Sequence, residues 1–401
     1  MTDWSVKGSL DYLASPTAIR DRAVLIADLT RHDDGVFALD ESRLDEVAER
    51  VVDSIRRKYP DIDVPCHSRW RHFEIEGTDS LQRFNDATTE HSAIELARTG
   101  LDLIIPSVLV DAGAGPRWQF QTSAGPVLSR SEGLAIASIE MFLSGIFSAD
   151  SSQPLRTDAD ALIALDLGGF ADRMQCTEEN PLIGVENRLL LLQQLGRIIQ
   201  SKPEIFPNAR LGDLADHLIA DSGASISATK ILSVILRLLG SMWPQRITVS
   251  GVNLGDAWWY SPPNAESESI VPFHKLSQWL TYSIAETLLN SSHTVTGLEQ
   301  LTGLAEYRNG GLFIDSGVLK LKQDFIRPSY PVESRTIVEW RALTVYLLDK
   351  TAERVQSILG RELSLTSILE GGTWHVGREL AYERSPSGDS PLQIISDGTV
   401  F

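Results

Sequence analysis

The feature that most constrains this chain is the recurrence of apolar residues at spacings of three and four along most of its length. Two early segments show it clearly, 16–29 ("PTAIRDRAVLIADL") and 40–59 ("DESRLDEVAERVVDSIRRKY"). This spacing lines one face of an α-helix with apolar side chains, so both segments are predicted to be amphipathic helices. Asp40 and Ser334 stand where an N-terminal cap would start a helix.

The same spacing continues along the chain. A helix is expected to begin near residue 92 and to be interrupted by Pro106. Further helices are predicted at 131–147, 156–166, 185–200, 211–219, 227–241, 273–290, 297–304, 335–358 and 363–370.

Strand signals are sparse. Segment 69–75 ("RWRHFEI") alternates and is predicted to be a strand, with 117–122 ("RWQFQT") as its hairpin partner. The tail 392–400 ("LQIISDGTV") predicts a short strand and a turn at Asp397-Gly398, whereas the Pro- and Gly-rich stretches 111–126 and 258–272 predict ordered loops. Because the strand–helix rhythm of a parallel sheet is missing, the predicted fold is mainly α with a few short strands.

The length of 401 residues is large for one hydrophobic core. We expect an N-terminal helical part, 1–150, that contains a short hairpin, and a C-terminal helical part, 151–401. The two are expected to pack as one unit around a shared pocket.

The net charge limits the classes of binding partner, and the cysteine content indicates the cellular compartment. A net charge of −18 argues against nucleic acid or an anionic membrane as the main partner, whereas a few local cations still permit a small anionic ligand. The two cysteines, Cys66 and Cys176, form no disulfide framework, and the opening residues carry no secretion signal. With no apolar run of membrane-spanning length, the expectation is a soluble cytoplasmic protein.

Common catalytic motifs are absent: no phosphate-binding GxxxxGK[ST], no GxGxxG after a strand, no HExxH and no GxSxG. Cys66 and His67 adjoin and His72 follows, but no further residue completes a zinc spacing. Neither a metal nor a cofactor is predicted.

Four polar-aromatic segments remain as candidates for a site. The first is "CHSRWRHFEI", in which an extended backbone would place Arg69 and Arg71 on one face and Trp70 and His72 on the other. Paired cations beside an aromatic ring suit a phosphorylated or planar ligand. The alternative is a surface strand whose arginines balance an acidic protein.

The second segment is "DAGAGPRW", which contains Asp111, Gly115 and Trp118. Glycine lets the backbone approach a ligand closely, and Asp111 ends an apolar run. The alternative is a tight turn in which Asp111 accepts hydrogen bonds from its own backbone.

The third segment, "VPFHKLSQWLTYS", is predicted to start a helix. Lys275, preceded by His274, would lie in the first turn, where the backbone N–H groups favour an anion. Trp279 follows four residues later on the same face and could stack on a planar group. The alternative is an amphipathic helix with Trp279 in its core.

The fourth segment is "EYRNGGLFIDSGVLKL", in which Arg308 precedes a glycine pair and Asp315 stands alone in an apolar run. A buried carboxylate is expensive unless it is paired, hydrogen-bonded or used in catalysis. Helix is expected to resume at about Ser316, so Asp315 is either a helix cap or a catalytic group.

Taken together, six stretches resemble the uracil-catabolism family of fungi and bacteria, which is often labelled uracil phosphoribosyltransferase. The resemblance runs from about residue 10 to the end and rests on these motifs: "HSRWRHFE", "DAGAGPRW", "RSEGLAIAS", "FHKLSQWLTYS", "EYRNGGLFIDSGVL" and "SDGTVF". The usual phosphoribosyltransferases have a strand followed by an acidic pair that holds Mg²⁺, and no such segment occurs here.

The order of several segments is also similar to that in the queuosine-salvage nucleotide N-glycosylases. The stretches are "RSEGLAIASIEMFLSGI", "NPLIGVENRLLLLQQLGRII", "FHKLSQWLTYSIAETL" and "GGLFIDSGVL". This similarity implies a helical fold like that of helix-hairpin-helix glycosylases, with Asp315 at the position of a family aspartate and Trp340-Arg341 near a comparable late helix.

The two resemblances together imply an N-ribosidase that releases urea or base from ribosylurea, or its 5′-phosphate, or from a related pyrimidine nucleotide. Asp315 would stabilise the oxocarbenium-like sugar, and Asp111 would hold ribose hydroxyls or the leaving urea. The expected partner is a small nucleotide-like substrate, with possible association with other enzymes of the pathway. The substrate-binding residues expected are Lys275, His274, Arg308, Arg71, Arg69, Trp70, Trp118, Trp279 and Arg341.

Two other functions stay open. The first is a phosphoribosyltransferase acting on uracil, which would need Mg²⁺ and phosphoribosyl pyrophosphate. The second is a nucleotide-binding partner of the pathway without catalytic activity, which would bind ligand without turnover.

Overall fold

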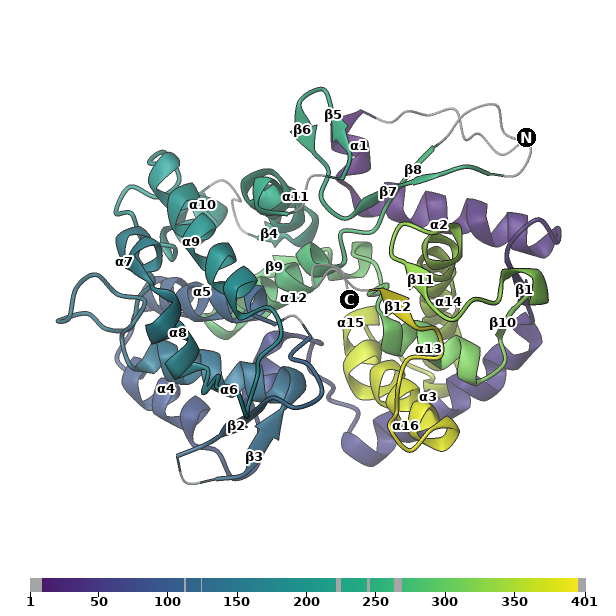
Figure 1. The fold of residues 1–401 in the computed structure, drawn as a ribbon, viewed down its shortest axis with the longest axis horizontal. Helices are drawn as coiled ribbons and strands as arrows, with labels where there is room; N and C mark the ends of the chain where they lie inside the picture. Colours follow the sequence, from purple (N-terminus) through teal and green to yellow (C-terminus); the bar gives the residue numbers. More distant parts are fainter. Residues whose placement is uncertain are drawn as a thin grey trace. The chain divides into compact units, whose positions relative to one another are not determined.

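A computed structural model gives the fold and describes residues 9–111, 113–123, 125–220, 225–243, 246–262 and 269–395 (Figure 1). The fold is mainly helical, as predicted, and its strands are two to four residues long and pair two by two. No helix in these ranges is both long enough and apolar enough to cross a bilayer.

The chain divides into two compact units that interleave along the sequence. Unit 1 comprises Met1–His67, Trp243–Trp279 and Gly297–Phe401, and unit 2 comprises Ser68–Met242 and Leu280–Thr296. The boundary expected near residue 150 falls inside unit 2. Long-range pairing explains why the sequence did not reveal this division, because the strand Phe37–Leu39 finds its partner at Leu319–Leu321.

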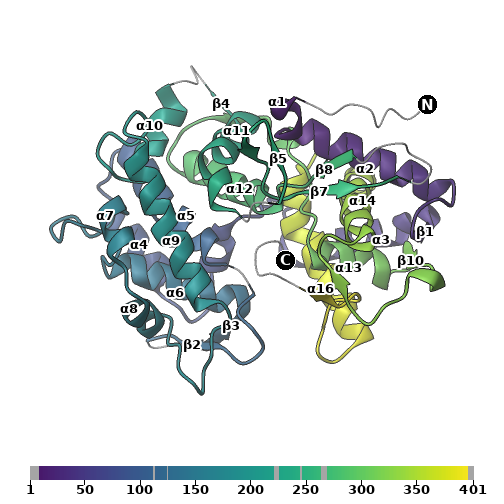
Figure 2. The same cartoon turned by 45° about the horizontal axis from the view of Figure 1, so that its top comes forward.

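Unit 1 is built around α14 (Arg335–Leu359), which is buried without interruption from Thr336 to Leu348. α14 packs against α2 (Pro16–Arg31), α3 (Leu44–Lys58) and α13 (Tyr307–Asp315), and α13 packs against α16 (Trp374–Arg384). Figures 1 and 2 both show α13, α14 and α16 side by side. Ser334 starts α14 as predicted, because its hydroxyl accepts the Ile337 N–H.

Short elements complete unit 1. The helices are α1 (Leu10–Leu13), α15 (Leu365–Ile368), the first residues of α12 (Lys275–Asn290), the 3₁₀ turns Glu41–Arg43, Leu298–Gln300 and Gln323–Phe325, and a π-helical turn, Leu369–Thr373. The antiparallel pairs are β1 (Phe37–Leu39) with β10 (Leu319–Leu321), β5 (Thr248–Val249) with β6 (Val252–Asn253), and β7 (Ala257–Tyr260) with β8 (Ser269–Pro272). The parallel pair is β11 (Tyr330–Pro331) with β12 (Ile394–Ile395).

Unit 2 surrounds α5 (Ala93–Leu109), which packs against α6 (Arg130–Leu143), α9 (Val185–Ser201) and α10 (Asp213–Ala220). Its other helices are α4 (Ser80–Thr88), α7 (Ala159–Ala164), α8 (Leu167–Arg173), α11 (Ala228–Leu239), the last residues of α12, and the 3₁₀ turns Arg69–Phe73 and Gly240–Met242. Its strands are the antiparallel pair β2 (Gln119–Gln121) and β3 (Val127–Ser129) and the parallel pair β4 (Ile226–Ser227) and β9 (Val295–Thr296).

Most helices fall where the apolar spacing predicts them, and four local predictions were wrong. α5 is not interrupted at Pro106 but continues through it to Leu109. Segment 69–75 is not a strand, because the Ser68 hydroxyl caps a 3₁₀ turn there, and β2 pairs with β3 instead. The helix predicted at 297–304 is only the 3₁₀ turn Leu298–Gln300. The loop predicted at 258–272 contains most of β7 and all of β8. In the tail, β12 is present, and the predicted turn at Asp397-Gly398 lies outside the described residues.

Candidate functional site

Asp315 lies at the end of a helix rather than at its start. α13 begins at Tyr307, and Glu306 is its cap: the two carboxylate oxygens accept the N–H groups of Arg308 (2.7 Å) and Asn309 (2.6 Å). The expectation that helix resumes at Ser316 is therefore wrong, and so is the alternative role of Asp315 as an N-terminal cap. Glu306 has taken that role nine residues earlier.

The glycine pair lies inside α13 because the helix is packed very closely at that point. A Cβ atom on Gly310 would come within 2.7 Å of Cε2 of Trp340 on α14, and the Gly310 carbonyl accepts the Trp340 indole N–H at 3.0 Å. A Cβ atom on Gly311 would come within 3.3 Å of Pro391. Packing therefore requires glycine at 310 and leaves little room at 311, and neither glycine has an unusual backbone conformation.

The Asp315 carboxylate is buried and only partly hydrogen-bonded. Its side chain is 3% exposed, and Oδ1 accepts a hydrogen bond from Arg384 Nε at 2.8 Å. Oδ2 is buried and has no hydrogen-bond partner among the residues that the structure describes. Burial raises the pKa of Asp315, while the charges of Arg384 and Arg308 act in the opposite direction. One carboxylate oxygen is thus held by Arg384, and the other accepts no hydrogen bond within the described part of the chain.

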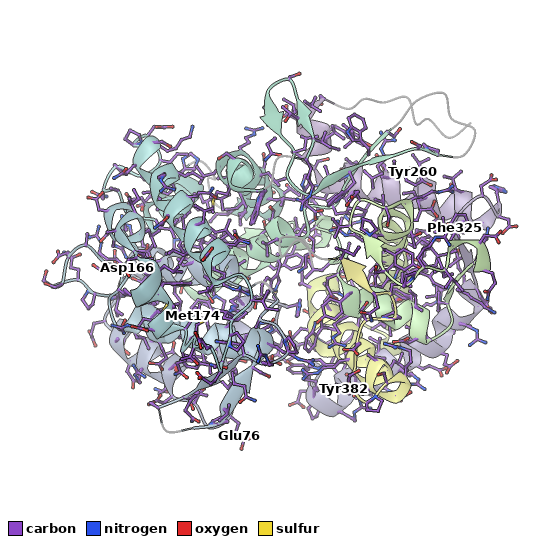
Figure 3. All side chains as sticks on the ribbon, viewed as in Figure 1. Glu76, Asp166, Met174, Tyr260, Phe325 and Tyr382 are labelled. Carbon is purple, nitrogen blue, oxygen red and sulfur yellow. The ribbon has the colours of Figure 1, made fainter. Side chains whose placement is uncertain are left out.

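The segment that follows α16 is anchored to the same two arginines. Arg308, which is buried, donates to the Gly388 carbonyl at 2.6 Å, and Arg384 donates to the Asp389 carbonyl. A Cβ atom on Gly388 would lie 2.8 Å from the ring of Tyr382, which Figure 3 labels on α16. We call Arg308, Asp315 and Arg384 the Asp315 cluster.

A second, largely buried acid in unit 1, Asp256, was missed by sequence reasoning. Arg341 binds it with two parallel hydrogen bonds, both 2.7 Å long. The Trp258 indole N–H (2.8 Å) and the backbone N–H of Lys275 (3.0 Å) complete its partners. Burial alone would raise the pKa of Asp256, but Arg341 and these donors hold it well below its usual range. The only sequence signal was an acid two residues before an aromatic run, in "GDAWWY".

The Asp256 carboxylate fixes the positions of Arg341 and of the Lys275 backbone. Arg341 is buried, and its guanidinium carbon stands 4.1 Å from the centroid of the Phe273 ring. Lys275 lies in the first turn of α12, as predicted, but the anion at that helix terminus is the Asp256 carboxylate. The cationic charge of Lys275 also opposes the rise in the pKa of Glu306 that burial causes.

His274 and Trp279 are buried at the start of α12. His274 adopts a left-handed backbone conformation (φ 50°), and its Nε2 lies 2.8 Å from the Leu13 carbonyl oxygen. Burial lowers the pKa of His274, and its Nδ1 has no hydrogen-bond partner within the described part of the chain. Trp279 is 4% exposed, so its ring is largely covered by protein.

In unit 2 the structure brings Arg69 and Asp111 together. The interpretations of the segments "CHSRWRHFEI" and "DAGAGPRW" did not anticipate this pairing. Arg69 is fully buried, with Nη1 3.1 Å from Asp111 Oδ1 and Nε donating to the Ser107 hydroxyl at 2.8 Å. Burial lowers the pKa of the Arg69 guanidinium. Arg188, which the sequence gave no reason to select, fixes the neighbouring loop by donating to the Val110 and Gly113 carbonyls.

The other aromatic and cationic candidates of unit 2 are held by protein groups. Trp118 is fully buried and donates to the carbonyl of Met174, which is labelled in Figure 3. Arg71 lies between two carboxylates, 2.7 Å from Glu74 and 2.5 Å from Glu286. A phosphate would therefore have to compete with two internal anions for Arg71.

Unit 1 contains one more buried cluster that the sequence did not reveal. Glu370 lies in the π-helical turn, and its carboxylate is 2.8 Å from His67 Nδ1 and 3.6 Å from Lys58 Nζ. These partners lower the pKa of Glu370 to about 2 despite burial, whereas burial lowers the pKa of neighbouring His375 to about 4. Within the described ranges, no group of three His, Cys, Asp or Glu side chains is arranged to hold a metal ion.

The predicted site residues thus fall into two sets. Unit 1 holds Asp315, Lys275, His274, Arg308, Trp279 and Arg341, and unit 2 holds Asp111, Arg69, Trp70, Arg71 and Trp118. The roles assigned to these residues, catalysis for Asp315 and Asp111 and substrate binding for the others, stay predictions. Asp315 and Asp111 each combine a buried side chain with a carboxylate oxygen that accepts no hydrogen bond from a described group. That oxygen of Asp111 is held 3.1 Å from the guanidinium of fully buried Arg69, so Asp315 is the stronger candidate for the chemistry.

Comparison with known proteins places the chain in a family. Residues 12–401 match the family described as "Protein of unknown function (DUF1688)". The chain is 40% identical over 380 residues to Protein urg3 of Schizosaccharomyces pombe, covering 91% of this chain and 92% of that protein. It is 33% identical over 440 residues to Uracil catabolism protein 4 of Lachancea kluyveri, covering 99% and 100%. The chain therefore belongs to the DUF1688 family.

Proposed function

We propose that this protein acts in uracil catabolism as an N-ribosidase that cleaves the N-glycosidic bond of ribosylurea 5′-phosphate or a closely related pyrimidine nucleotide. The name of one full-length relative, Uracil catabolism protein 4, supports the pathway. The observation that carries the chemistry is the buried Asp315 carboxylate, with one oxygen held by Arg384 and the other without a hydrogen bond among the described residues.

The reaction needs the kind of group that Asp315 supplies. As the C–N bond breaks, the anomeric carbon gains positive charge, which a fixed carboxylate in a water-poor site stabilises. Water then adds its oxygen to that carbon, and its proton passes to the leaving nitrogen, giving urea and ribose 5-phosphate. The role requires an ionised acid, and the charges of Arg384 and Arg308 oppose the rise in the pKa of Asp315 that burial causes.

In this proposal the 5′-phosphate is bound near the Asp315 cluster rather than by Lys275. Lys275 acts on Glu306 at the N-terminal end of α13, whereas Asp315 is the last residue of this nine-residue helix. At a rise of 1.5 Å per residue the two ends lie about 12 Å apart. Arg384 and the charge of Arg308, whose side chain acts on the pKa of Asp315 although Arg308 stands in the first turn of α13, supply the cations near the proposed chemistry. A phosphate anchored there would position the sugar.

The test is a metal-free incubation of the purified protein with ribosylurea 5′-phosphate, in which free urea is measured. Asp315→Asn is compared with Asp349→Asn, because Asp349 is another acid of unit 1 paired with an arginine, 2.8 Å from Arg20. We expect the native protein and Asp349→Asn to release urea, and folded Asp315→Asn to be at least about 100-fold slower.

Each other outcome has a definite meaning. Equal rates for the two variants would remove Asp315 from the chemistry. No urea from the native protein would overturn the ribosidase. Formation of uridine monophosphate from uracil, phosphoribosyl pyrophosphate and Mg²⁺ would then establish the transferase, and binding without turnover would establish a nucleotide-binding partner.

A further inference from the structure

Unit 2 contains a pocket of about 340 Å³ formed by the 3₁₀ turn Arg69–Phe73 and by α4, α5 and α12. This volume lies at the lower end of the range found for small-molecule sites. All four elements contribute to the pocket through residues of unit 2.

One wall of the pocket is aromatic and held in place. The rings of Trp70 and Phe84 lie 5.7 Å apart at 56°, and the Trp70 indole N–H donates to the Thr287 hydroxyl at 2.9 Å. Gly100 makes this packing possible, because a Cβ atom there would come within 2.4 Å of Thr287 Cγ2. A preformed aromatic wall suits a flat ring, which loses little conformational freedom on binding.

The rim supplies neutral hydrogen-bonding groups. Asn85 on α4 and Asn290 on α12 line the pocket with exposed carboxamide side chains. A carboxamide offers both N–H donors and a carbonyl acceptor, which match the alternating C=O and N–H groups of a cyclic imide or ureide. Arg71 adds a buried Nε–H that has no hydrogen-bond partner in the described ranges and suits a carbonyl oxygen.

The charge of the pocket disfavours phosphate. The Arg71 guanidinium is flanked by Glu74 at 2.7 Å and Glu286 at 2.5 Å, so two carboxylates face one cation. A phosphorylated ligand would be repelled by this excess of negative charge, whereas an uncharged base would not.

We propose that this pocket of unit 2 binds an uncharged planar ring carrying amide-type groups, of the pyrimidine-base class. The proposal rests on the pocket itself and does not require the ribosidase reaction, so the two stand or fall separately. The probe is uracil, because a full-length relative is named for uracil catabolism.

The test is calorimetric titration of the full chain with uracil and, separately, with uridine 5′-monophosphate. The double variant Asn85→Ala/Asn290→Ala is compared with Gln82→Ala, which removes another exposed carboxamide from α4 but does not line the pocket. We expect one uracil per chain, at least tenfold weaker binding in the double variant, unchanged binding in Gln82→Ala, and weaker binding of the nucleotide.

Three results would overturn the proposal: no binding of uracil, equal binding by the double variant, or tighter binding of the nucleotide than of the base. Leu96→Trp, which would place a large ring in the pocket, provides an independent check and should abolish uracil binding in a protein with native circular dichroism. Urea release is measured separately, so failure here is distinguished from failure of the proposed reaction.

Discussion

Asp315 and Arg384 are the last residues of two packed helices, α13 and α16, and they are joined by a single hydrogen bond of 2.8 Å. The Asp256–Arg341 pair in the same unit is joined by two. Both carboxylate oxygens of Asp256 accept hydrogen bonds from Arg341, as a structural ion pair requires. Asp315 keeps one oxygen outside the pair at a helix C-terminus, where the helix dipole also disfavours an anion. Such an arrangement costs stability, and we interpret it as a functional one.

The first prediction concerns the pH dependence of urea release. Arg384 lowers the pKa of Asp315 against the effect of burial, so Arg384→Gln should let that pKa rise. Because the proposed reaction needs the ionised acid, the acid limb of the pH–rate profile should move to higher pH. Arg50→Gln is the control, since Arg50 is an exposed arginine paired with Glu383, next to Arg384 in sequence. Profiles that superimpose for the two variants would contradict this role of Arg384.

The second prediction concerns the stability provided by the Asp256–Arg341 pair. Arg341→Met leaves the Asp256 carboxylate without its cation, so the free energy of unfolding should fall by about 3–5 kcal/mol. Adding Asp256→Asn should restore part of that loss, because the uncompensated charge is removed. Arg354→Met on the same helix breaks an exposed pair with Asp45 and should cost less than about 1 kcal/mol. Guanidinium denaturation measures all three variants, and a double variant no better than the single one would refute the argument.

The third prediction concerns acid stability. The pKa of Glu370 falls from an ordinary 4.5 to about 2 in the folded protein, so its contribution is complete above pH 4.5 and is lost as the pH falls toward 2. A lowering of this size corresponds to roughly 3 kcal/mol. The pKa of His375 is lowered from 6.5 to about 4 in the folded protein. As the pH falls from 6.5 toward 4, His375 is protonated in the unfolded chain before it is protonated in the folded protein, so the free energy of unfolding decreases over this range.

Glu370→Gln separates these two effects. The variant should be less stable than the native protein at neutral pH, and the difference should shrink below pH 4.5, while the decline between pH 6.5 and 4 persists. Exposed Glu362→Gln is the matched control. If the free energies of unfolding of native protein and Glu370→Gln differed by the same amount at every pH down to 2, Glu370 would not be the source of this pH dependence.

The helices were largely predictable because apolar spacing is a local property of the sequence. The position of Lys275 at the start of α12 and the burial of Asp315 followed from the same reading. The start of α13 was not predicted, because glutamate is an uncommon N-terminal cap and the glycine pair resembled a loop.

The partners of the buried acids were not predictable from local sequence. Arg384 follows Asp315 by 69 residues, and Arg341 follows Asp256 by 85. Charged residues at such separations give no local pattern, so only the packing of α13 on α16 and of α14 within unit 1 brings them together. The interleaving of the two units was not predictable for the same reason, because it depends on contacts between distant segments.

The last prediction tests whether the glycines of α13 serve packing. In a helix alanine is intrinsically favoured over glycine by up to about 1 kcal/mol, so Gly310→Ala would stabilise an isolated helix. Here the new Cβ atom would meet Trp340 Cε2 at 2.7 Å, and either α13 or the indole must shift. We expect a net loss of about 1–3 kcal/mol in the free energy of unfolding, from overpacking. Gly113→Ala is the control, because no described atom lies within 4 Å of its Cβ position. If Gly310→Ala were as stable as Gly113→Ala, close packing against Trp340 would not be the reason for glycine at this position.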